Sequence, residues 1–457
     1  MNKLQIFQAL PFPLKNLAAS YRGFQLKKIR TKKREEFLIE IAKKDTWDKK
    51  MISEFQSTRL KEILAYSILH IPYYRTLWEK IHTEKPFTDH LEISNWPILE
   101  KETIRNNPDM FISDEVKKSE LINIPTSGTT GKPMNFWFDS YTISYWYALY
   151  EHRIKRWNGV DDSDRWANVG GQLIYNIKKN KPPFWTWNMV MKQLYLSSYH
   201  ITPENIIHYL SALKKYKIKY LLGYVSSIYN LANEGLKQGL EFPGLSLVIT
   251  NAEPLFAHQR PIIEKAFKCK VIQTYSGCEF AFSANEDLNQ DMYIWPEAGY
   301  LETVDQDGKN TEEGGELVTT GLLNKAMPLI RYRVGDTVKI NKGITGSKNF
   351  DYIEEISGRT DDLVRTRDGK LVGRLDPVFK VDLKIKEAQI IQEDYDLFTV
   401  KIVADTDFSD DDRQSISTRL KERVGENAIV NFELVDDIPR GANGKFKAVV
   451  SKIKSIS

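Results

Sequence analysis

Cysteine is scarce in this sequence, since the 457 residues include only Cys269 and Cys278. A chain of this size with two cysteines is not a disulfide scaffold and is typical of a reducing cytoplasm. The seven histidines are scattered without the spacing of zinc ligands, so we predict no zinc site. No apolar run reaches the roughly 20 residues that cross a bilayer, and the first residues lack the apolar core of a signal peptide. We therefore expect a cytoplasmic protein.

Extremes of composition are also absent. Hydrophobic residues make up 41% of the chain and charged residues 28%, which is typical of a soluble globular protein. A chain of 457 residues is longer than one hydrophobic core usually supports. We therefore predict two or three domains.

The formal net charge of +4 is small, but it is unevenly distributed. Residues 1–50 contain 13 Lys or Arg and 5 Asp or Glu, a balance of +8. A solvated helix face is the favoured interpretation of this segment. The alternative is a basic amphipathic segment, residues 1–35, in weak peripheral contact with anionic lipid at the inner membrane face. We expect no nucleic-acid partner, because no binding motif accompanies the charge.

The pattern of apolar residues divides the chain into three stretches. Residues 1–120 are predicted to be mostly helical and to form the N-terminal part of a large domain. Residues 121–358 alternate short apolar runs with helical stretches, which predicts an α/β core of helices packed on mixed sheets, with a strand-rich distal part. Residues 359–457 predict a small mobile α+β domain, with a seam near 357–362. The strands and helices expected most clearly are strands 220–222, 247–249, 271–274, 299–303, 315–319, 336–340, 352–355, 385–392, 398–404 and 429–435, and helices 203–217, 228–238 and 410–424.

One segment combines glycines, hydroxyls and a lysine in the way that a polyanion-binding loop does. Two glycines allow close approach of the backbone, four hydroxyls supply donors and the lysine supplies charge. The spacing differs from that of a Walker A loop, which places four residues between its first glycine and the Gly-Lys pair. A polar surface turn is the alternative. The segment consists of Thr126, Ser127, Gly128, Thr129, Thr130, Gly131 and Lys132, followed by Pro133.

Four further segments carry polar groups at positions suited to nucleotide chemistry. A carboxylate after a strand can bind magnesium, and an aspartate can bind ribose hydroxyls. Of the other two segments, one lies on the predicted domain seam and one is a polar turn that ends in a lysine. Each is weak alone, because most surface carboxylates and lysines bind nothing. The segments are Tyr275–Glu279, Arg331–Asp336, Gly358–Asp362 and Pro439–Phe446.

Taken together and in this order, the five segments resemble the adenylate-forming superfamily of acyl-CoA synthetases, peptide-synthetase adenylation domains and luciferases. The resemblance extends from about residue 120 to the end of the chain. Pro328–Arg333 and Asn251–Pro254 resemble the phenylacetate–CoA ligase branch of this superfamily. Three other stretches resemble its capsular-polysaccharide (CapK-like) members, which are mostly known from bacterial capsule and O-antigen gene sets. These stretches are 181–185, 193–200 and 373–380.

The resemblance implies a role for each motif residue. The Thr126–Lys132 loop would hold the β,γ-phosphates of ATP, and Thr130 and Glu279 would place Mg²⁺. Lys445 would reach into the site during adenylation, where it stabilises charge developing at the α-phosphate. Asp361 would be the hinge about which the small domain rotates between the two half-reactions. The implied nucleoside contacts are Ala252, Glu253 and Tyr275 at adenine, and Asp336 and Arg359 at ribose.

The chain departs from the family pattern in four places. Cys278 stands where the family usually has a phosphate-binding threonine, a loss that the hydroxyl of Ser276 would offset. Met134 replaces a lysine that often follows Lys-Pro. Residues 341–357 lack the cysteines of several relatives, so no zinc is implied. Residues 367–373 differ from the segment that lines the pantetheine tunnel of CoA ligases, which leaves CoA as one candidate acceptor among several.

Three functions compete at this point. The favoured one is a ligase that converts a small carboxylic acid and ATP to acyl-AMP and pyrophosphate and then transfers the acyl group, in bacterial surface polysaccharide biosynthesis. Its acceptor would be CoA, a carrier thiol, or a sugar amine or hydroxyl; a CoA ligase for an aryl acid is the nearest alternative. The others are a non-catalytic scaffold of a polysaccharide assembly complex and a kinase or ATPase. The aromatic residues of 157–187 indicate either core packing or an acyl pocket.

Overall fold

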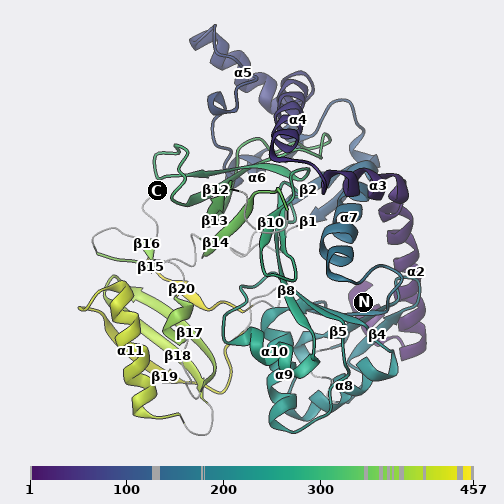
Figure 1. Cartoon of the computed structure of the whole chain (residues 1–457), viewed down its shortest axis with the longest axis vertical. Helices are drawn as coiled ribbons and strands as arrows, with labels where there is room; N and C mark the ends of the chain where they lie inside the picture. Colours follow the sequence, from purple (N-terminus) through teal and green to yellow (C-terminus); the bar gives the residue numbers. More distant parts are fainter. Residues whose placement is uncertain are drawn as a thin grey trace.

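The structure is a computed structural model that describes residues 3–453 except 126–133, 177–178, 180, 344–347, 360–363, 368–370, 373–374, 380–384, 405–407 and 440–445. Figure 1 shows a large part built on a long sheet and a smaller part, coloured yellow-green, that contains the last strands and helix. The large part is α/β and the smaller part is α+β, which confirms the predicted fold class. None of the described helices is both long and apolar enough to cross a membrane.

Helices dominate the first 120 residues, as predicted. Asp48 caps the longest of them by accepting a hydrogen bond from the Met51 amide at 2.8 Å. The next helix begins at Pro72, a position where the missing N–H of proline costs nothing. These helices are α1 (Lys3–Ala9), α2 (Phe12–Arg30), α3 (Arg34–Lys44), α4 (Lys49–His70), α5 (Pro72–Glu84) and α6 (Lys101–Asn106).

A twelve-stranded sheet runs through the large part. Its strand order is β11-β12-β13-β14-β10-β9-β8-β7-β6-β3-β5-β4. The segment β8-β7-β6-β3-β5 is parallel, and the pairings on either side of it are antiparallel. The parallel strands are β3 (Trp166–Gly170), β5 (Gln193–Ser197), β6 (Tyr220–Tyr224), β7 (Leu247–Asn251) and β8 (Lys270–Ser276). The others are β4 (Trp185–Asn188), β9 (Ser283–Glu286), β10 (Met292–Ile294), β11 (Gly299–Val304), β12 (Gly315–Gly321), β13 (Tyr332–Asn341) and β14 (Tyr352–Arg359).

Helices cover the parallel strands because those strands are apolar on both faces. Leu221 and Val248 pack with Leu213 and Ile228 of the covering helices in one core cluster, and Ile249 belongs to a second. The covering helices are α7 (Ser140–Leu149), α8 (Ile206–Lys215), α9 (Val225–Lys237) and α10 (Gln259–Phe267). α8 is shorter than the predicted helix 203–217, because residues 203–205 form a 3-10 turn and Lys217 is left-handed at φ 51°. α9 begins three residues before its predicted start.

The small part matches its predicted elements closely. Its sheet has the order β19-β18-β17-β20, and Ile390, Val400 and Leu420 form part of its core. Its helix spans the predicted residues 410–424, where Ser409 and Asp412 form a capping box. The elements are β17 (Ile385–Asp394), β18 (Leu397–Ala404), α11 (Asp410–Val424), β19 (Ile429–Leu434) and β20 (Val449–Ser451). Two further sheets have two strands each. β1 (Ile122–Pro125) pairs with β2 (Asn135–Phe138) in the large part, and β15 (Val364–Arg365) pairs with β16 (Leu371–Val372).

The aromatic residues between 157 and 187 have separate packing partners. Trp157 meets Phe350 at a ring distance of 6.0 Å. Trp166 stacks on Tyr220 at 5.9 Å, and Trp187 packs on Tyr216 at 4.9 Å. These contacts favour the core-packing interpretation over a single acyl pocket.

Candidate active site

Three neighbouring parallel strands end at one edge of the sheet, and predicted site residues follow two of them. β6 ends at Tyr224, which pairs in register with Asn251, the residue before Ala252 and Glu253. β8 ends with Tyr275 and Ser276. Because the carboxyl ends of parallel strands meet at the same edge, these separate motifs lie close together. This edge is the usual place for a ligand in an open α/β sheet.

The residues expected at ribose are brought together by β13 and β14. Asp336 and Arg359 are directly opposite one another in the antiparallel register of these strands. The hydroxyl of Tyr275 donates a hydrogen bond to Oδ2 of Asp336 at 2.6 Å. The backbone of Arg359 is described, while its side chain lies outside the described part. Tyr275 therefore ties the end of the parallel region to the strand pair that carries the predicted ribose residues.

Glu279, the predicted magnesium ligand, is positioned by two residues that sequence reasoning did not assign to it. The hydroxyl of Tyr332 donates to Oε1 of Glu279 at 3.2 Å. The other carboxylate oxygen lies over Gly277, where an added Cβ would be 2.0 Å from Oε2. Only a residue without a side chain leaves that space. Tyr332 belongs to the 331–336 motif, so its place in the sequence was a signal that could have identified it.

Glu253 is buried and its carboxylate accepts hydrogen bonds from both parts of the molecule. Oε2 accepts from the Ser226 amide at 2.7 Å, and Oε1 accepts from the Ser226 hydroxyl at 3.1 Å. Oε1 also accepts from the amide of Phe446 at 3.0 Å. Phe446 directly follows Lys445 in the sequence. Glu253 therefore joins the start of α9 to the segment in which the family places its lysine.

The left-handed backbone of Ala252, at φ 64°, occurs where the chain leaves β7. A non-glycine residue in this conformation is uncommon and often accompanies a functional turn. Nearby, burial raises the pKa of the Tyr224 hydroxyl, and the negative charge of Glu253 raises it further. Tyr199 and Cys278 are also close enough to act on Tyr224. Tyr224 lies at this edge beside Glu253 and was missed by the motifs; its position at the end of a parallel strand was the available signal.

Several predicted residues lie outside the described part of the chain. They are the loop Thr126, Ser127, Gly128, Thr129, Thr130, Gly131 and Lys132, the hinge residue Asp361, and Lys445. Pro125 and Asn135, which flank the loop, pair across β1 and β2. The roles of the loop residues, of Asp361 and of Lys445 stay predictions.

The described residues fit the groups that the resemblance implies. The carboxylate of Asp336, whose backbone pairs in register with that of Arg359, suits vicinal ribose hydroxyls. The carboxylate of Glu279 is a hard oxygen ligand of the kind Mg²⁺ prefers. Within the described ranges, one group of three side chains could share a metal ion, and it consists of His70, Asp114 and Glu115. Glu279 is not a member of this group. Glu279 would therefore supply one ligand, and phosphates and water the others, as is usual for Mg²⁺.

Comparison with known proteins gives three kinds of relative. Residues 363–452 match the family model of the CapK C-terminal domain. The chain is 30% identical over 408 residues to Protein CapK of Staphylococcus aureus, covering 88% of this chain and 89% of that protein. It is 24% identical to the phenylacetate-coenzyme A ligase of Thermus thermophilus, covering 71% and 74%.

The solved structures show a shared fold. A 2-hydroxyisobutyryl-CoA ligase in its postadenylation state, in complex with R3-HIB-AMP, has a TM-score of 0.69 at 19% identity, covering 90% of this chain and 92% of that one. The same ligase in an open conformation with 2-HIB-AMP and CoA has a TM-score of 0.54, covering 87% and 91%. At this level of identity, the likeness concerns the fold alone.

Proposed function

The chain belongs to the CapK subgroup of the adenylate-forming ligases, as its motifs predicted, and on this premise we propose that it activates a carboxylic acid with ATP. The acid would become an acyl-AMP with release of pyrophosphate, and a nucleophile would then displace AMP. The observation that supports this most is the convergence of Tyr275, Asp336 and Glu279 at the carboxyl edge of the parallel strands. Each contact there joins two motifs that are far apart in the sequence.

The described residues suggest how the first step is organised. Tyr275 and Asp336, with Arg359, would bind the nucleoside and direct its α-phosphate toward the edge of the sheet. A carboxylate oxygen of the acid would attack that phosphorus, and the bond to the pyrophosphate oxygen would break. Mg²⁺ would supply Lewis-acid neutralisation of the phosphate charge. Tyr332 would orient the carboxylate of Glu279 so that one of its oxygens can bind the metal. Ala252 and Glu253 would border adenine.

We propose that the phosphates contact the loop of Thr126–Lys132, with Thr130 near the metal and Ser276 replacing the missing hydroxyl at position 278. Lys445 would approach the α-phosphate during adenylation. The proposed domains are residues 1–120 and 121–358 of the large part and 359–457 of the small one. Asp361 would let the small domain turn before acyl transfer.

The acceptor is proposed from two different relatives. The name of the CapK relative favours bacterial surface polysaccharide synthesis, in which a sugar amine, sugar hydroxyl or carrier thiol would receive the acyl group. The phenylacetate-coenzyme A ligases favour CoA as acceptor of an aryl or other acyl group. We give the polysaccharide role first place, because the CapK relative covers more of the chain. Neither Cys269 nor Cys278 forms a disulfide, which together with the proposed use of ATP supports a cytoplasmic location.

The proposal is tested with a panel of aryl, fatty, amino and sugar acids in an ATP–pyrophosphate exchange assay. The acid that supports exchange is then incubated with CoA, a carrier-protein thiol and amino sugars, and the product is identified by mass spectrometry. Exchange with one class of acid, followed by an acyl-sugar or acyl-carrier product, would support the polysaccharide role. An acyl-CoA product alone would support the second candidate. The absence of exchange with every acid of a broad panel would contradict both candidates.

Gly277→Ala should weaken the use of magnesium without unfolding the protein. The added methyl group would displace the carboxylate of Glu279. No backbone atom is among the nearest neighbours of a Cβ at this position, so the main chain has no clash to avoid. We expect the magnesium concentration for half-maximal exchange to rise roughly 10- to 100-fold, the usual scale for a disturbed outer-shell contact. The thermal midpoint should change little. Gly244→Ala is the control, because a Cβ there meets nothing within 4 Å; equal magnesium requirements in both variants would contradict this role.

Glu253→Ala should impair adenylation more than acyl transfer. The substitution removes the acceptor for the Phe446 amide, next to the lysine proposed for the first step. Loss of a hydrogen bond to a charged group predicts roughly a 10- to 100-fold lower exchange rate. The rate of acyl transfer from preformed acyl-AMP should fall much less than the exchange rate. Ser226→Ala is the matched control, because it removes one hydroxyl donor to Glu253 and keeps the Phe446 contact; a similar loss of exchange in this control would contradict the proposed link.

A further inference from the structure

Helix α2 lies along the outside of the large part, at the right edge of Figure 1, and packs against β4 and α7. Its inner side is fixed by polar contacts to the strand and the turn after it. Oδ1 of Asn16 accepts from the Trp187 amide at 2.9 Å, and Oγ of Ser20 accepts from the Met189 amide at 3.0 Å. Gly23 is buried against Asn188, whose side chain comes within 2.3 Å of a Cβ built there. These contacts determine which side of α2 faces outward.

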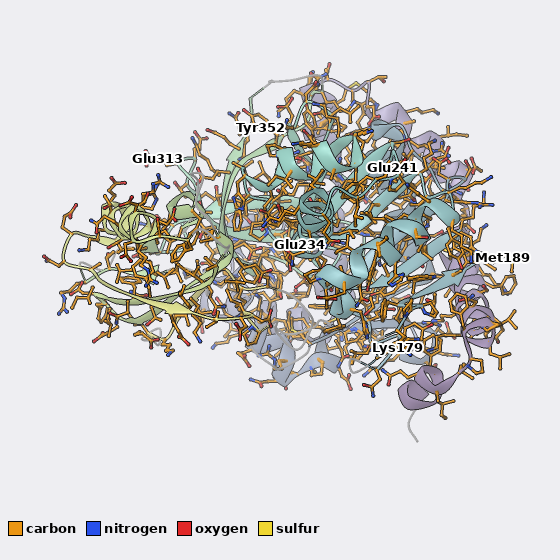
Figure 2. The ribbon with its side chains drawn as sticks, turned by 90° about the horizontal axis from the view of Figure 1, so that it is seen from below. Lys179, Met189, Glu234, Glu241, Glu313 and Tyr352 are labelled. Atoms are coloured by element: carbon orange, nitrogen blue, oxygen red, sulfur yellow. The ribbon has the colours of Figure 1, made fainter. Side chains whose placement is uncertain are left out.

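The outward side of α2 is apolar. Leu14, Leu17, Tyr21 and Phe24 are 50%, 59%, 68% and 59% exposed. Their spacing of three, four and three residues places them in one row on the helix, about 15 Å long. Met189, held beside the helix through Ser20, is 63% exposed and extends the apolar surface. Figure 2 shows Met189 at the outer edge of the molecule. We call these five residues the α2 stripe.

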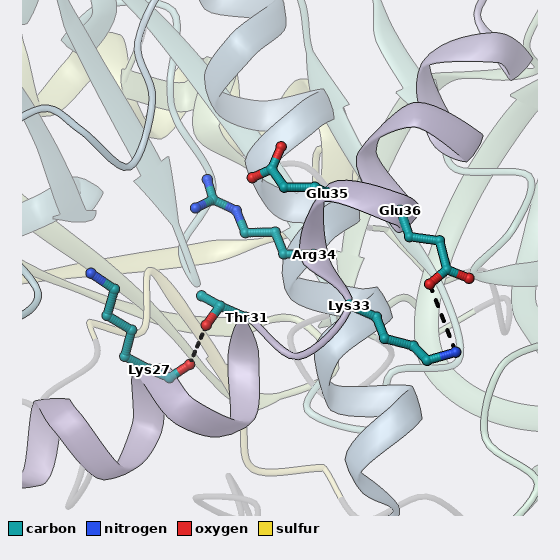
Figure 3. A pocket seen from close by; sticks show the side chains of 6 residues that line it. All are labelled: Lys27, Thr31, Lys33, Arg34, Glu35 and Glu36. Atoms are coloured by element: carbon teal, nitrogen blue, oxygen red, sulfur yellow. Dashed lines mark hydrogen bonds and ion pairs between the residues drawn. The ribbon is translucent and has the colours of Figure 1, made fainter.

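Exposed basic side chains border the α2 stripe at its C-terminal end and on its flanks. The first 34 residues contain nine Lys or Arg and no Asp or Glu, and of these nine Lys15 is buried and Arg34 pairs with Glu151 and Asp162. Lys28 is exposed one turn beyond Phe24 and continues the row, and Arg22 and Lys27 are exposed on its two flanks. The first acidic residues, Glu35 and Glu36, lie beyond the turn that ends α2. Figure 3 shows this turn, where Lys33 pairs with Glu36 at 3.7 Å and the side chain of Lys27 points away from that pair.

We propose that the α2 stripe and its basic border bind the surface of an anionic lipid bilayer. Leucine, aromatic and methionine side chains would enter the boundary between head groups and acyl chains, where tyrosine is well suited. The basic residues would pair with anionic head groups. A second copy of the chain fits the stripe less well, because two acid-free basic segments would repel one another. This surface is independent of the proposed catalytic edge, so the two proposals can fail separately.

Co-sedimentation of the full chain with vesicles tests the proposal. Vesicles of phosphatidylcholine with about 30% phosphatidylglycerol should bind the protein, and binding should be lost at high salt, where charge is screened within a few ångströms. Leu17→Gln with Phe24→Gln, and separately Lys27→Glu with Lys28→Glu, should each lower the partition coefficient about tenfold or more. These side chains are exposed, so circular dichroism should show an unchanged fold.

Matched controls distinguish binding through the α2 stripe from nonspecific adsorption to vesicles. Phe87→Gln removes a fully exposed aromatic ring elsewhere, and Lys117→Glu reverses an exposed charge away from α2. Both should bind vesicles like the original protein. Equal binding to pure phosphatidylcholine, equal losses in the controls, or no binding would overturn the proposal. A dimer in analytical ultracentrifugation that is lost in Leu17→Gln with Phe24→Gln would also overturn it, in favour of a second copy as occupant.

Discussion

Lys445→Ala should lower the rate of acyl-AMP formation by roughly two to three orders of magnitude, the scale for losing one oriented transition-state group. Attack on the α-phosphate concentrates negative charge on its oxygens, and a lysine ammonium positioned there stabilises this charge. The structure supports the position through the next residue, because the Phe446 amide is bonded to Glu253 beside the strand edge. The free energy of unfolding should stay nearly constant, since residues 441–444 predict a polar turn with little packing.

ATP–pyrophosphate exchange with the active acid measures this loss. Lys447→Ala is a suitable control, because its carbonyl accepts from Gln389 and this backbone contact survives the substitution. The control should keep exchange close to that of the original protein. Undiminished exchange in Lys445→Ala would show that another group stabilises the phosphate charge and would refute the assignment.

Asp361→Pro should separate the two half-reactions. Proline fixes φ near −65°, so a residue that must change its backbone angles between two domain orientations would be confined to one of them. We expect one half-reaction to persist and the other to be nearly abolished. Retained exchange with loss of final product is one expected form, and the reverse is the other.

The measurement compares exchange with single-turnover transfer from preformed acyl-AMP. Asp361→Ala is the control, because it removes the carboxylate and keeps backbone rotation; both half-reactions should survive in it. Equal loss of both steps in the proline variant, with an intact fold, would argue against a hinge at this residue. An equal loss of one half-reaction in the alanine and proline variants would show that the side chain matters and rotation does not.

Local signals in the sequence were sufficient for many elements. The start of the helix 410–424 has a local signal, because Ser409 and Asp412 form a capping box within three residues, and Gly425 follows its last residue. The strand at 398–404 and the edge residues of β8 were also evident from short patterns. The predicted start of α9 was late by three residues, because the carboxylate that caps it comes from Glu253, in the loop after the next strand.

The contacts of the site depend on strand register, which motifs do not encode. Tyr275 and Asp336 are 61 residues apart, and their hydrogen bond forms although β9, β10 and β14 lie between β8 and β13 in the order of the sheet. The resemblance could name both residues but could not pair them. The outward direction of the α2 stripe was equally hidden, because it depends on the approach of Asn188 to Gly23.

The nucleotide products of the reaction test the central claim most directly. The purified protein is incubated with ATP, magnesium, the active acid and the acceptor that the panel identifies, which takes the acyl group and releases AMP. The products are separated by anion-exchange chromatography with a pyrophosphate assay in parallel. Cleavage at the α-phosphate predicts AMP and pyrophosphate in equal amounts, dependent on the acid and lost in Lys445→Ala. Formation of ADP and phosphate would identify a kinase or ATPase, and absence of any acid-dependent cleavage would identify a scaffold; either result would contradict an adenylate-forming ligase.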